Sequence, residues 1–429
     1  MPEQFIQPNP WMILPFAILL AAIALGPLIN ADAWGKQYPK IAFGLGAITL
    51  GYYLFSLKAH AHVLGVAHEY VSFIILIGSL YVVSGGIHIT VKGEATPLEN
   101  VFFLLIGAVI ANVLGTTGAS MLLIRPWIRM NKYRVTAHHI VFFIFIVSNV
   151  GGCLTPIGDP PLFLGYLKGV PFAWVPEHCW PMWAVGVGLL LAMFYVVDVR
   201  NFRRAPQAIR AELAEPPDTF KFQGLHNVFF LAVILGAVFV PRPIFLREGL
   251  MLAAAVGSWF TTNKQIHASN HFNFHPIQEV AILFVGIFAT MMPALDWLQA
   301  NAVHYADKLG GFSPTLFYWG SGTLSSVLDN APTYLSFLSA SAGEAVADPA
   351  KIATLTADTK FHELLVAISV GAVFFGANTY IGNGPNFMVK AIADQQKVHT
   401  PGFLGYVFKF TLPFMLPMLA VVWFLFFRH

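Results

Sequence analysis

Two acidic residues of this 429-residue chain are expected near the middle of a lipid bilayer, where carboxylates are rare. Asp159 belongs to GGCLTPIGDPPLFL (151–164), and Asp329 to SSVLDNAPT (325–333). Burying a carboxylate at bilayer depth is costly, so each aspartate needs a partner or a function. A carboxylate taken out of water holds a proton more readily, so it can exchange that proton for a metal ion. Both aspartates are therefore candidate sites where a cation and a proton compete.

Hydroxyl and amide oxygens surround both aspartates in the sequence, and such oxygens suit a hard cation. The predicted cation- and proton-binding residues are Asp159, Asp329, Asn330, Thr155, Thr379 and Asn383. A supporting or substrate-binding set comprises Asn149, Gly158, Thr117, Ser120, Thr333, Asn378 and Asn386. We expect Na⁺ to be held by Asp159, Thr155, Asn330 and Asn383. No catalytic residue and no resident cofactor is expected, because Na⁺ and H⁺ are transported or coupling ions.

The composition places these residues in a membrane protein. Charged residues make up 10% of the chain and hydrophobic ones 57%, and the mean hydropathy is +0.67. Water-soluble domains contain about 25% charged residues, which excludes a soluble enzyme, a nucleic-acid binder and a disordered chain. The net charge of +3 implies no polyanionic partner, and the two cysteines are too few for a disulfide framework or a thiolate metal site. The sequence therefore predicts an all-α polytopic protein in the lipid bilayer.

Twelve apolar runs are long enough to span a bilayer or nearly so. They lie at 11–30, 40–57, 70–90, 97–124, 138–168, 178–197, 225–240, 245–262, 277–298, 312–341, 362–392 and 402–427. Segments 97–130 and 312–341 carry the turn-like sequences TTGAS (116–120) and DNAPT (329–333), so we interpret each as a re-entrant hairpin. Irregular backbone at this depth survives only where protein or a wet cavity satisfies it.

Ten crossings remain, five on each side of a polar segment near mid-chain. We predict a first repeat at 1–198, a cytoplasmic linker at 199–224 and a second repeat at 225–429. Five crossings per half invert the second half relative to the first. With both termini outside, the predicted cytoplasmic segments hold 16 of the 24 Lys and Arg residues and the outer segments hold 8. This distribution agrees with the positive-inside rule.

The two halves also share sequence. Residues 151–164 align without gaps on FGANTYIGNGPNFM (375–388), at an offset of 224, and an offset of 213 places Thr117 opposite Asn330. The aligned loops are rich in Gly and Pro, which an intact helix tolerates poorly. We therefore predict broken helices at 138–168 and 362–392, whose unwound carbonyls and helix ends bind ions.

These motifs resemble the ion transporter superfamily, and the resemblance covers nearly the whole chain. It is carried by GGCLTPIGDPPLFL, SSVLDNAPT, GANTYIGNGPNFMVKAI (376–392) and PIQEVAILFVGIF (276–288). The chain is most similar to a bacterial group described both as NhaD-type sodium/proton antiporters and as CitMHS-like citrate transporters. The resemblance implies a site where hairpin tips meet unwound loops, a scaffold and a transport subdomain, a homodimer and the bacterial inner membrane.

The residues favour a Na⁺/H⁺ antiporter that works by alternating access. No Lys or Arg lies in the loops or at the hairpin tips, and Arg125 is the nearest, which favours a cation over an anion. The main alternative is a transporter of citrate, another dicarboxylate or metal-citrate, coupled to Na⁺ or H⁺. The minor alternatives are an arsenite-type efflux permease and an intramembrane aspartyl protease that uses Asp159 and Asp329.

Two further interpretations stay open at this stage. Asp329 could instead cap the second arm of its hairpin, and Asp159 could be a structural carboxylate that holds its loop together. Among the 15 histidines, His138 and His139 begin the span that leads into the first loop. A metal site or pH sensor there is possible, although a structural role is the commoner one for such residues.

Overall fold

The chain folds almost entirely into helices. The computed structural model describes residues 7–90, 95–204, 221–240, 243, 245–308 and 311–428. The first half forms η1 (Pro10–Ile13), α1 (Leu14–Gly51), η2 (Tyr52–Ser56), α2 (His60–Gly85), β1 (His88–Thr90), α3 (Pro97–Met130), α4 (Ala137–Ile146), η3 (Val150–Leu154), α5 (Pro160–Leu167) and α6 (Trp174–Arg204).

The second half begins with a short strand and is otherwise helical. It forms β2 (Lys221–Gln223), α8 (Asn227–Val238), α9 (Leu246–Thr261), α10 (Lys264–Ser269), α11 (His275–Lys308), α12 (Pro314–Ser325), α13 (Asn330–Ala342), η4 (Gly343–Ala347), α14 (Pro349–Leu355), α15 (Thr359–Phe375), η5 (Gly376–Asn378), α16 (Gly384–Gln395), α17 (Phe403–Tyr406), η6 (Val407–Met415) and α18 (Leu416–Phe426).

Seven helical segments of the described chain are long and apolar enough to cross a bilayer. They are His60–Gly85, Pro97–Met130, Ala137–Leu154, Trp174–Arg204, His275–Trp297, Thr359–Asn378 and Phe403–Phe426. The predicted class, an all-α polytopic membrane protein, is therefore confirmed. The predicted spans at 225–240 and 245–262 correspond to α8 with 12 residues and α9 with 16. Each is shorter than the ~20 residues that a crossing needs, so ten crossings and inverted repeats stay predictions.

The chain reverses direction within two segments that are helical on either side of a break. In α1 the break is at Asn30 (φ −157°, ψ 97°), and the amide of Asn9 donates to the hydroxyl of Tyr52 at 3.0 Å. A straight helix would hold those residues ~64 Å apart, so α1 is two antiparallel arms. In α3 the break is at Gly115 (φ 73°), and Ala95 N bonds Met130 O at 2.8 Å. The arms α12 and α13 form a similar pair joined by Ser326–Asp329.

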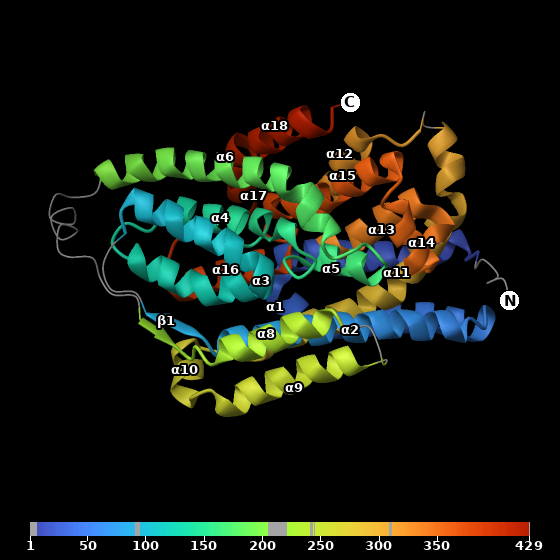
Figure 1. Cartoon of the computed structure of the whole chain (residues 1–429), viewed down its shortest axis with the longest axis horizontal. Coiled ribbons are helices and arrows are strands. Elements are labelled where there is room, and N and C mark those ends of the chain that lie inside the picture. Colours follow the sequence, from blue (N-terminus) through green and yellow to red (C-terminus); the bar gives the residue numbers. More distant parts are fainter. Residues whose placement is uncertain are drawn as a thin grey trace.

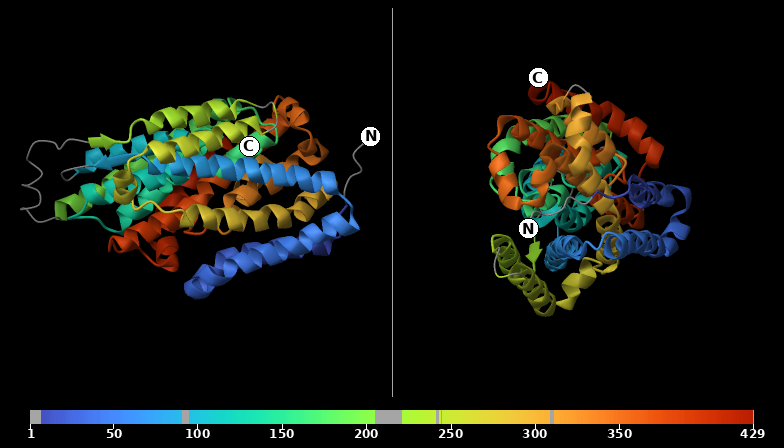
Figure 2. Two further views of the ribbon diagram at one scale, coloured as in Figure 1. Left: turned by 90° about the horizontal axis from the view of Figure 1, so that it is seen from below. Right: turned by 90° about the vertical axis from the view of Figure 1, so that its right-hand side faces the viewer.

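The helices are arranged in layers. Figure 1 shows α2, α8 and α9 along the lower edge, α6 and α18 along the upper edge, and α3, α4, α5 and α13 between them. The end-on view in Figure 2 separates the yellow-green α8 and α9 from the teal, green and orange helices. Helix α1 packs along α11, and α2 packs against α9 and α11. Helix α13, the second arm of the α12–α13 pair, contacts α5, α11 and α15, so this pair packs among the helices that flank the two loops.

The helices α4 and α15 occupy the centre of the molecule. Every side chain from Ile140 to Val147 is fully buried, and so are most of those between Leu364 and Phe375. A helix that is apolar all round suits either a protein interior or the lipid, and the burial of these two helices places them in the interior. These two helices lead directly into the unwound loops, so the loops begin at the most enclosed part of the fold.

The described residues contain one small β-ribbon, which the sequence did not predict. Strands β1 and β2 pair antiparallel, with His88 opposite Gln223. The predicted linker 199–224 is also shorter than expected, because α6 continues as a helix to Arg204 and β2 begins at Lys221. A helix can extend beyond its apolar run when its polar end finds buried partners, as Asp198 does here. Residues 205–220 of the linker lie outside the described residues.

Candidate functional site

The two unwound loops run at 147–159 and 376–383, and each folds back closely on itself. A Cβ atom added to Gly158 would lie 2.1 Å from the carbonyl oxygen of Gly152, and one added to Gly382 would lie 2.6 Å from that of Gly376. Only glycine allows two backbone segments to approach so closely. The aligned glycines of the two motifs therefore have the same structural task in both halves.

Two aligned threonines fasten each loop to its hairpin. The hydroxyl of Thr155 donates to the carbonyl of Asn112 at 2.6 Å and accepts from the amide of Gly158 at 3.1 Å. The hydroxyl of Thr379 donates to the carbonyl of Ser326 at 2.6 Å and accepts from the amide of Gly382 at 3.1 Å. None of the hydrogen bonds of the described residues joins either threonine to Asp159. Their hydroxyls brace the loops in this structure.

Asp159 lies at the point where all four interrupted elements meet, and its side chain is buried. Its carboxylate accepts hydrogen bonds from the hydroxyl of Thr116 at 2.7 Å, the amide group of Asn330 at 2.5 Å and that of Asn383 at 3.1 Å. Thr116 comes from the tip of α3, Asn330 begins α13, and Asn383 immediately precedes α16. Each of these three hydrogen-bond partners is an uncharged donor.

Asn330 has a second feature that bears on ion binding. Its amide nitrogen contacts Asp159, while its amide oxygen is buried and has no hydrogen-bond partner. A buried acceptor without a partner is costly. A carboxylate beside an amide oxygen is a donor set that a hard cation prefers.

Asparagine side chains join the two loops across the centre. Asn149 donates to the side-chain oxygen of Asn386 at 2.7 Å and accepts from Asn383 at 3.1 Å. Asn386 donates in turn to the carbonyls of Gly376 and Thr379, each at 2.8 Å. The sequence predicted that unwound carbonyls would face an ion, whereas amide groups satisfy these carbonyls here. The asparagines therefore hold the two loops in register with each other.

Asp329 directly precedes Asn330 but has contacts of its own. It is half-buried, and its carboxylate accepts from the amide of Ala331 at 3.1 Å, which is an N-cap for α13. It lines a cavity, described below, and interacts electrostatically with Asp159 without a hydrogen bond to it. Among the described contacts, no hydrogen bond joins the two aspartates into the carboxyl pair that an aspartyl protease uses.

The other supporting residues bind near the site without reaching Asp159. Ser120 shares a hydrogen bond with Ser148 at 2.7 Å, and Thr333 donates to the backbone of Asp329 at 3.0 Å. Asn378 donates to Ser326 at 2.8 Å. Thr117 and Gly158 line a gap of about 20 Å³ against α2, which has room for about one water molecule.

The sequence missed Thr116 and Asn112. Thr116 follows the turn at Gly115, and the prediction placed the turn in 116–120 and selected Thr117 instead. A signal existed, because the offset of 213 residues places Thr116 opposite Asp329. The buried side chain of Asn112 donates to the carbonyl of Gly151 at 2.7 Å and accepts from the amide of Leu154 at 2.8 Å.

A wide cavity leads to the second hairpin tip and the second loop. Its volume is about 930 Å³, and its walls come from α1, α3, α11 and α16. Asp329 and Asn383 lie on its wall, as do the cations Arg125 and Arg129 and the carboxylate Glu279. Among the described residues, Arg125 and Arg129 of α3 therefore line this cavity, and neither is among the hydrogen-bond partners of Asp159.

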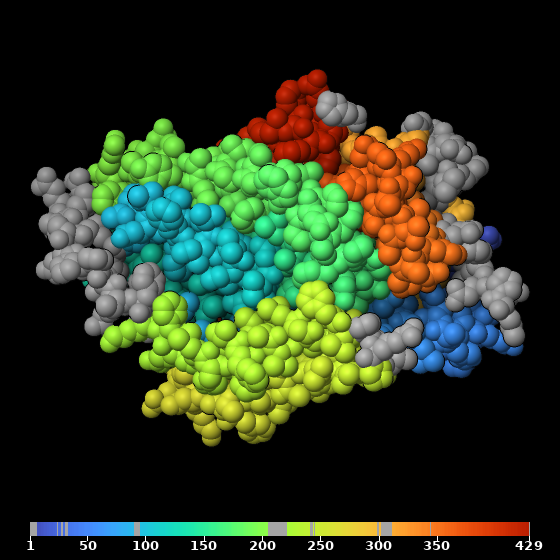
Figure 3. All heavy atoms as spheres, viewed as in Figure 1, coloured from blue at the N-terminus to red at the C-terminus, as the bar shows by residue number. Residues whose placement is uncertain are grey.

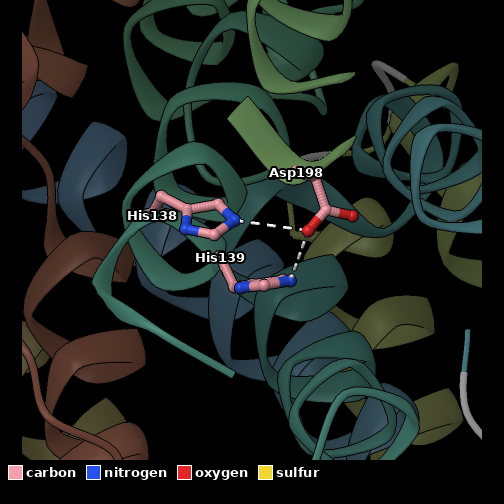
Figure 4. Close-up of side chains that lie close together, drawn as sticks. All are labelled: His138, His139 and Asp198. Carbon is pink, nitrogen blue, oxygen red and sulfur yellow. Dashed lines mark hydrogen bonds and ion pairs between the residues drawn. The ribbon is translucent and has the colours of Figure 1, made fainter. Parts of the chain in front are cut away.

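A separate cluster contains His138, His139 and Asp198, which Figure 4 shows converging from α4 and α6. Their donor atoms lie within 4.8 Å of one another, the spacing of a metal site. However, Asp198 accepts a bidentate ion pair from Arg134 and a hydrogen bond from Asn100 at 2.9 Å. A guanidinium on the carboxylate repels a metal cation. We conclude that this cluster is a buried ion pair that ties α3, α4 and α6 together.

We expect Asp198→Asn to lower the free energy of unfolding by about 3–5 kcal/mol. The change leaves Arg134 buried without a counter-charge, since both side chains are at most 2% exposed. Thermal unfolding of the detergent-solubilised protein measures the effect. Asp394→Asn is the control, because Asp394 pairs with Lys390 on the surface of α16, where an ion pair contributes little. Equal stability of the two variants would contradict the prediction.

Comparison of the chain with known protein families identifies the family to which it is similar. A family described as "Putative citrate transport" matches residues 6–427. This match confirms the resemblance to the CitMHS-like group that the motifs carry. A search of curated proteins found no significant match to the chain.

Proposed function

The chain belongs to the family described as "Putative citrate transport", and from this premise we propose that it is a secondary transporter that exchanges a small monovalent cation, Na⁺ or Li⁺, for protons at Asp159. We further propose that it works as a homodimer in the bacterial inner membrane with both termini outside. Both terminal residues lie outside the described part of the chain.

The environment of Asp159 carries this proposal. The carboxylate is buried and contacts three uncharged donors, so no Lys or Arg among its contacts neutralises its charge. A charge in such a place has to be neutralised by a proton or by a bound cation. The free amide oxygen of Asn330 supplies a second cation ligand. Because a proton and a cation would use the same carboxylate, binding one displaces the other.

A wide cavity that reaches the site supports alternating access. The cavity of about 930 Å³ reaches Asn383, which donates directly to Asp159. On the opposite side, the first loop, Asp159 included, packs against α2 with a gap of only about 20 Å³. The site is therefore approached from one side. Under the predicted topology, Arg125 and Arg129 mark that side as cytoplasmic.

Everted membrane vesicles test the cation exchange. In vesicles that hold a preformed pH gradient, adding Na⁺ or Li⁺ should dissipate the gradient, as a pH-sensitive dye reports. Vesicles without the protein give the background, and choline chloride controls for ionic strength. A wild-type protein that gives no response to either cation would overturn the proposal.

A carboxylate transporter is the second candidate, and one observation favours it beside the family description. Arg125 and Arg129 line the cavity that leads to the site, and arginines bind carboxylates through paired hydrogen bonds. In this arrangement Asp159 would hold the coupling cation, and the organic anion would bind in the cavity.

For this candidate we expect wild-type vesicles to accumulate labelled citrate in the presence of a Na⁺ or H⁺ gradient. Arg125→Met should reduce uptake at least tenfold, because losing one charge-assisted hydrogen bond costs about 1.5–3 kcal/mol. Lys390→Met is the control, since Lys390 lies outside the cavity wall. Cation exchange without any citrate uptake would exclude the second candidate.

A further inference from the structure

The two aligned motifs have different surroundings. Phe163 in the first motif aligns with Phe387 in the second, yet Phe163 is 2% exposed and Phe387 is 47% exposed. Phe163 packs in the closed interface with α2, and Phe387 lines the wide cavity. The first motif is therefore closed off from solvent while the second is open to it.

An ion pair fastens the closed side. The ammonium group of Lys168, directly after α5, lies 2.7 Å from the carboxylate of Glu69 on α2. Both side chains are mostly buried, at 18% and 22% exposure. Glu69 precedes Phe73 by one helical turn, and Phe73 lines the closed interface. The pair therefore lies at the end of the contact between α5 and α2.

The pair also connects the site to a different part of the fold. Helix α5 begins directly after Asp159, so a displacement of Asp159 relative to α2 also displaces Lys168. Lys168 interacts electrostatically with Asp296 of α11 as well. That carboxylate is buried, accepts from Tyr53 at 2.6 Å and lies 3.3 Å from His62. Lys168 at the end of α5 is thus attracted to carboxylates on two other helices, Glu69 on α2 and Asp296 on α11.

Other contacts cover the same end of α5. Tyr166 donates to the carbonyl of Val238 at 2.8 Å, and Phe172 packs on Phe239 with ring centroids 4.7 Å apart. A Cβ atom on Gly169 would lie 2.2 Å from the carbonyl of Pro349. Figure 3 shows the green residues of this region in contact with the orange and yellow-green residues around them. The closed side is therefore sealed at the surface.

We propose that the Glu69–Lys168 ion pair is a latch that holds the side opposite the cavity closed and opens during each transport cycle. The inference rests on the proposed alternating access but not on the identity of the transported ion. Among the described residues of the second half, no ion pair occupies the position equivalent to Glu69–Lys168. Ile392 occupies the position aligned with Lys168 at the offset of 224, so the second motif has no ammonium group there. Glu279, which lies near the start of α11, lines the cavity. The latch therefore biases the resting protein toward the state with the open cavity.

Labelling of an introduced cysteine tests the latch. Phe163→Cys places a thiol in the closed interface. Both native cysteines, Cys153 and Cys179, are buried, so the background labelling should be low. In otherwise unchanged protein, a membrane-impermeant maleimide applied from that side should label this cysteine slowly. Adding Glu69→Gln or Lys168→Met should raise the labelling rate about threefold to fivefold, the effect of removing an ion pair of up to ~1 kcal/mol. Phe387→Cys should label from the cavity side, and more slowly when the latch is removed.

Exchanging the charges of Glu69 and Lys168 distinguishes loss of the ion pair from a general loss of folding. Glu69→Lys together with Lys168→Glu should restore slow labelling at Phe163→Cys, while Glu69→Lys alone should label fast. Asp394→Asn, which breaks the Lys390–Asp394 pair within α16, should leave the rate unchanged. The latch is wrong if neither Glu69→Gln nor Lys168→Met changes the labelling at Phe163→Cys. The labelling experiment needs no transported ion. If the latch variants change the labelling rate but the wild-type protein exchanges no cation in vesicles, the latch stands and only the proposed cation exchange is wrong.

Discussion

Asp159→Asn is expected to reduce cation-dependent dissipation of the pH gradient by about 100-fold or more. The amide keeps the size of the side chain and can still accept from Thr116, but it neither binds nor releases a proton at ordinary pH. It also removes the only charged ligand from the cation site that we propose. Because the carboxylate is buried among neutral donors, removing its charge should not destabilise the fold.

Binding can be measured separately from transport. Na⁺ at 100 times its dissociation constant should stabilise the wild-type protein by about 2.7 kcal/mol, as a shift in thermal unfolding. Asp159→Asn should lose this shift, and Asp394→Asn should keep it. If Asp159→Asn retained both the shift and the exchange, Asp159 would be a structural carboxylate that holds its loop together.

Gly158→Ala should abolish transport and lower the unfolding free energy by about 3 kcal/mol or more. Its new Cβ atom would lie 2.1 Å from the carbonyl oxygen of Gly152. This oxygen belongs to the backbone, so no side-chain rotation relieves the contact and the loop has to open. Opening the loop also moves Asp159, the next residue. The measurements are thermal unfolding and the vesicle assay.

Gly384→Ala is the matched control for this change. Gly384 begins α16 beside Asn383, and nothing lies within 4 Å of the position of an added Cβ atom. We expect this variant to have normal stability and normal transport. A similar loss in both variants would mean that the loops are generally sensitive to substitution and that the close backbone approach at Gly158 has no special role.

Sequence patterns located the site well where the chemistry is local. Asp159, Asn330 and Asn383 were selected because they interrupt apolar runs at aligned positions, and the structure brings all three into contact. Thr116 was missed because the exact turn of a hairpin depends on one glycine, Gly115, whose positive φ is not visible in composition. The roles of these residues in transport stay predictions.

Features that depend on distant packing were not visible in the sequence. Arg134 and Asp198 are 64 residues apart, and neither belongs to a sequence motif that would indicate its burial. Their burial arises because α3, α4 and α6 converge there. The cavity is similar, because its walls come from α1, α3, α11 and α16, and no local pattern shows which of two aligned motifs is enclosed.

The contacts of Asp159 also have a consequence for the order in which the protein is made. One donor, Thr116, comes from the same half of the chain, while Asn330 and Asn383 are synthesised 171 and 224 residues later. Asn149 likewise cannot form its hydrogen bond to Asn386 until a further 237 residues have been synthesised. During biogenesis, the newly inserted first half therefore contains a carboxylate and an amide whose main partners do not yet exist. Insertion of the second half completes these contacts, so the first half reaches its final structure only after nearly the entire chain has left the ribosome.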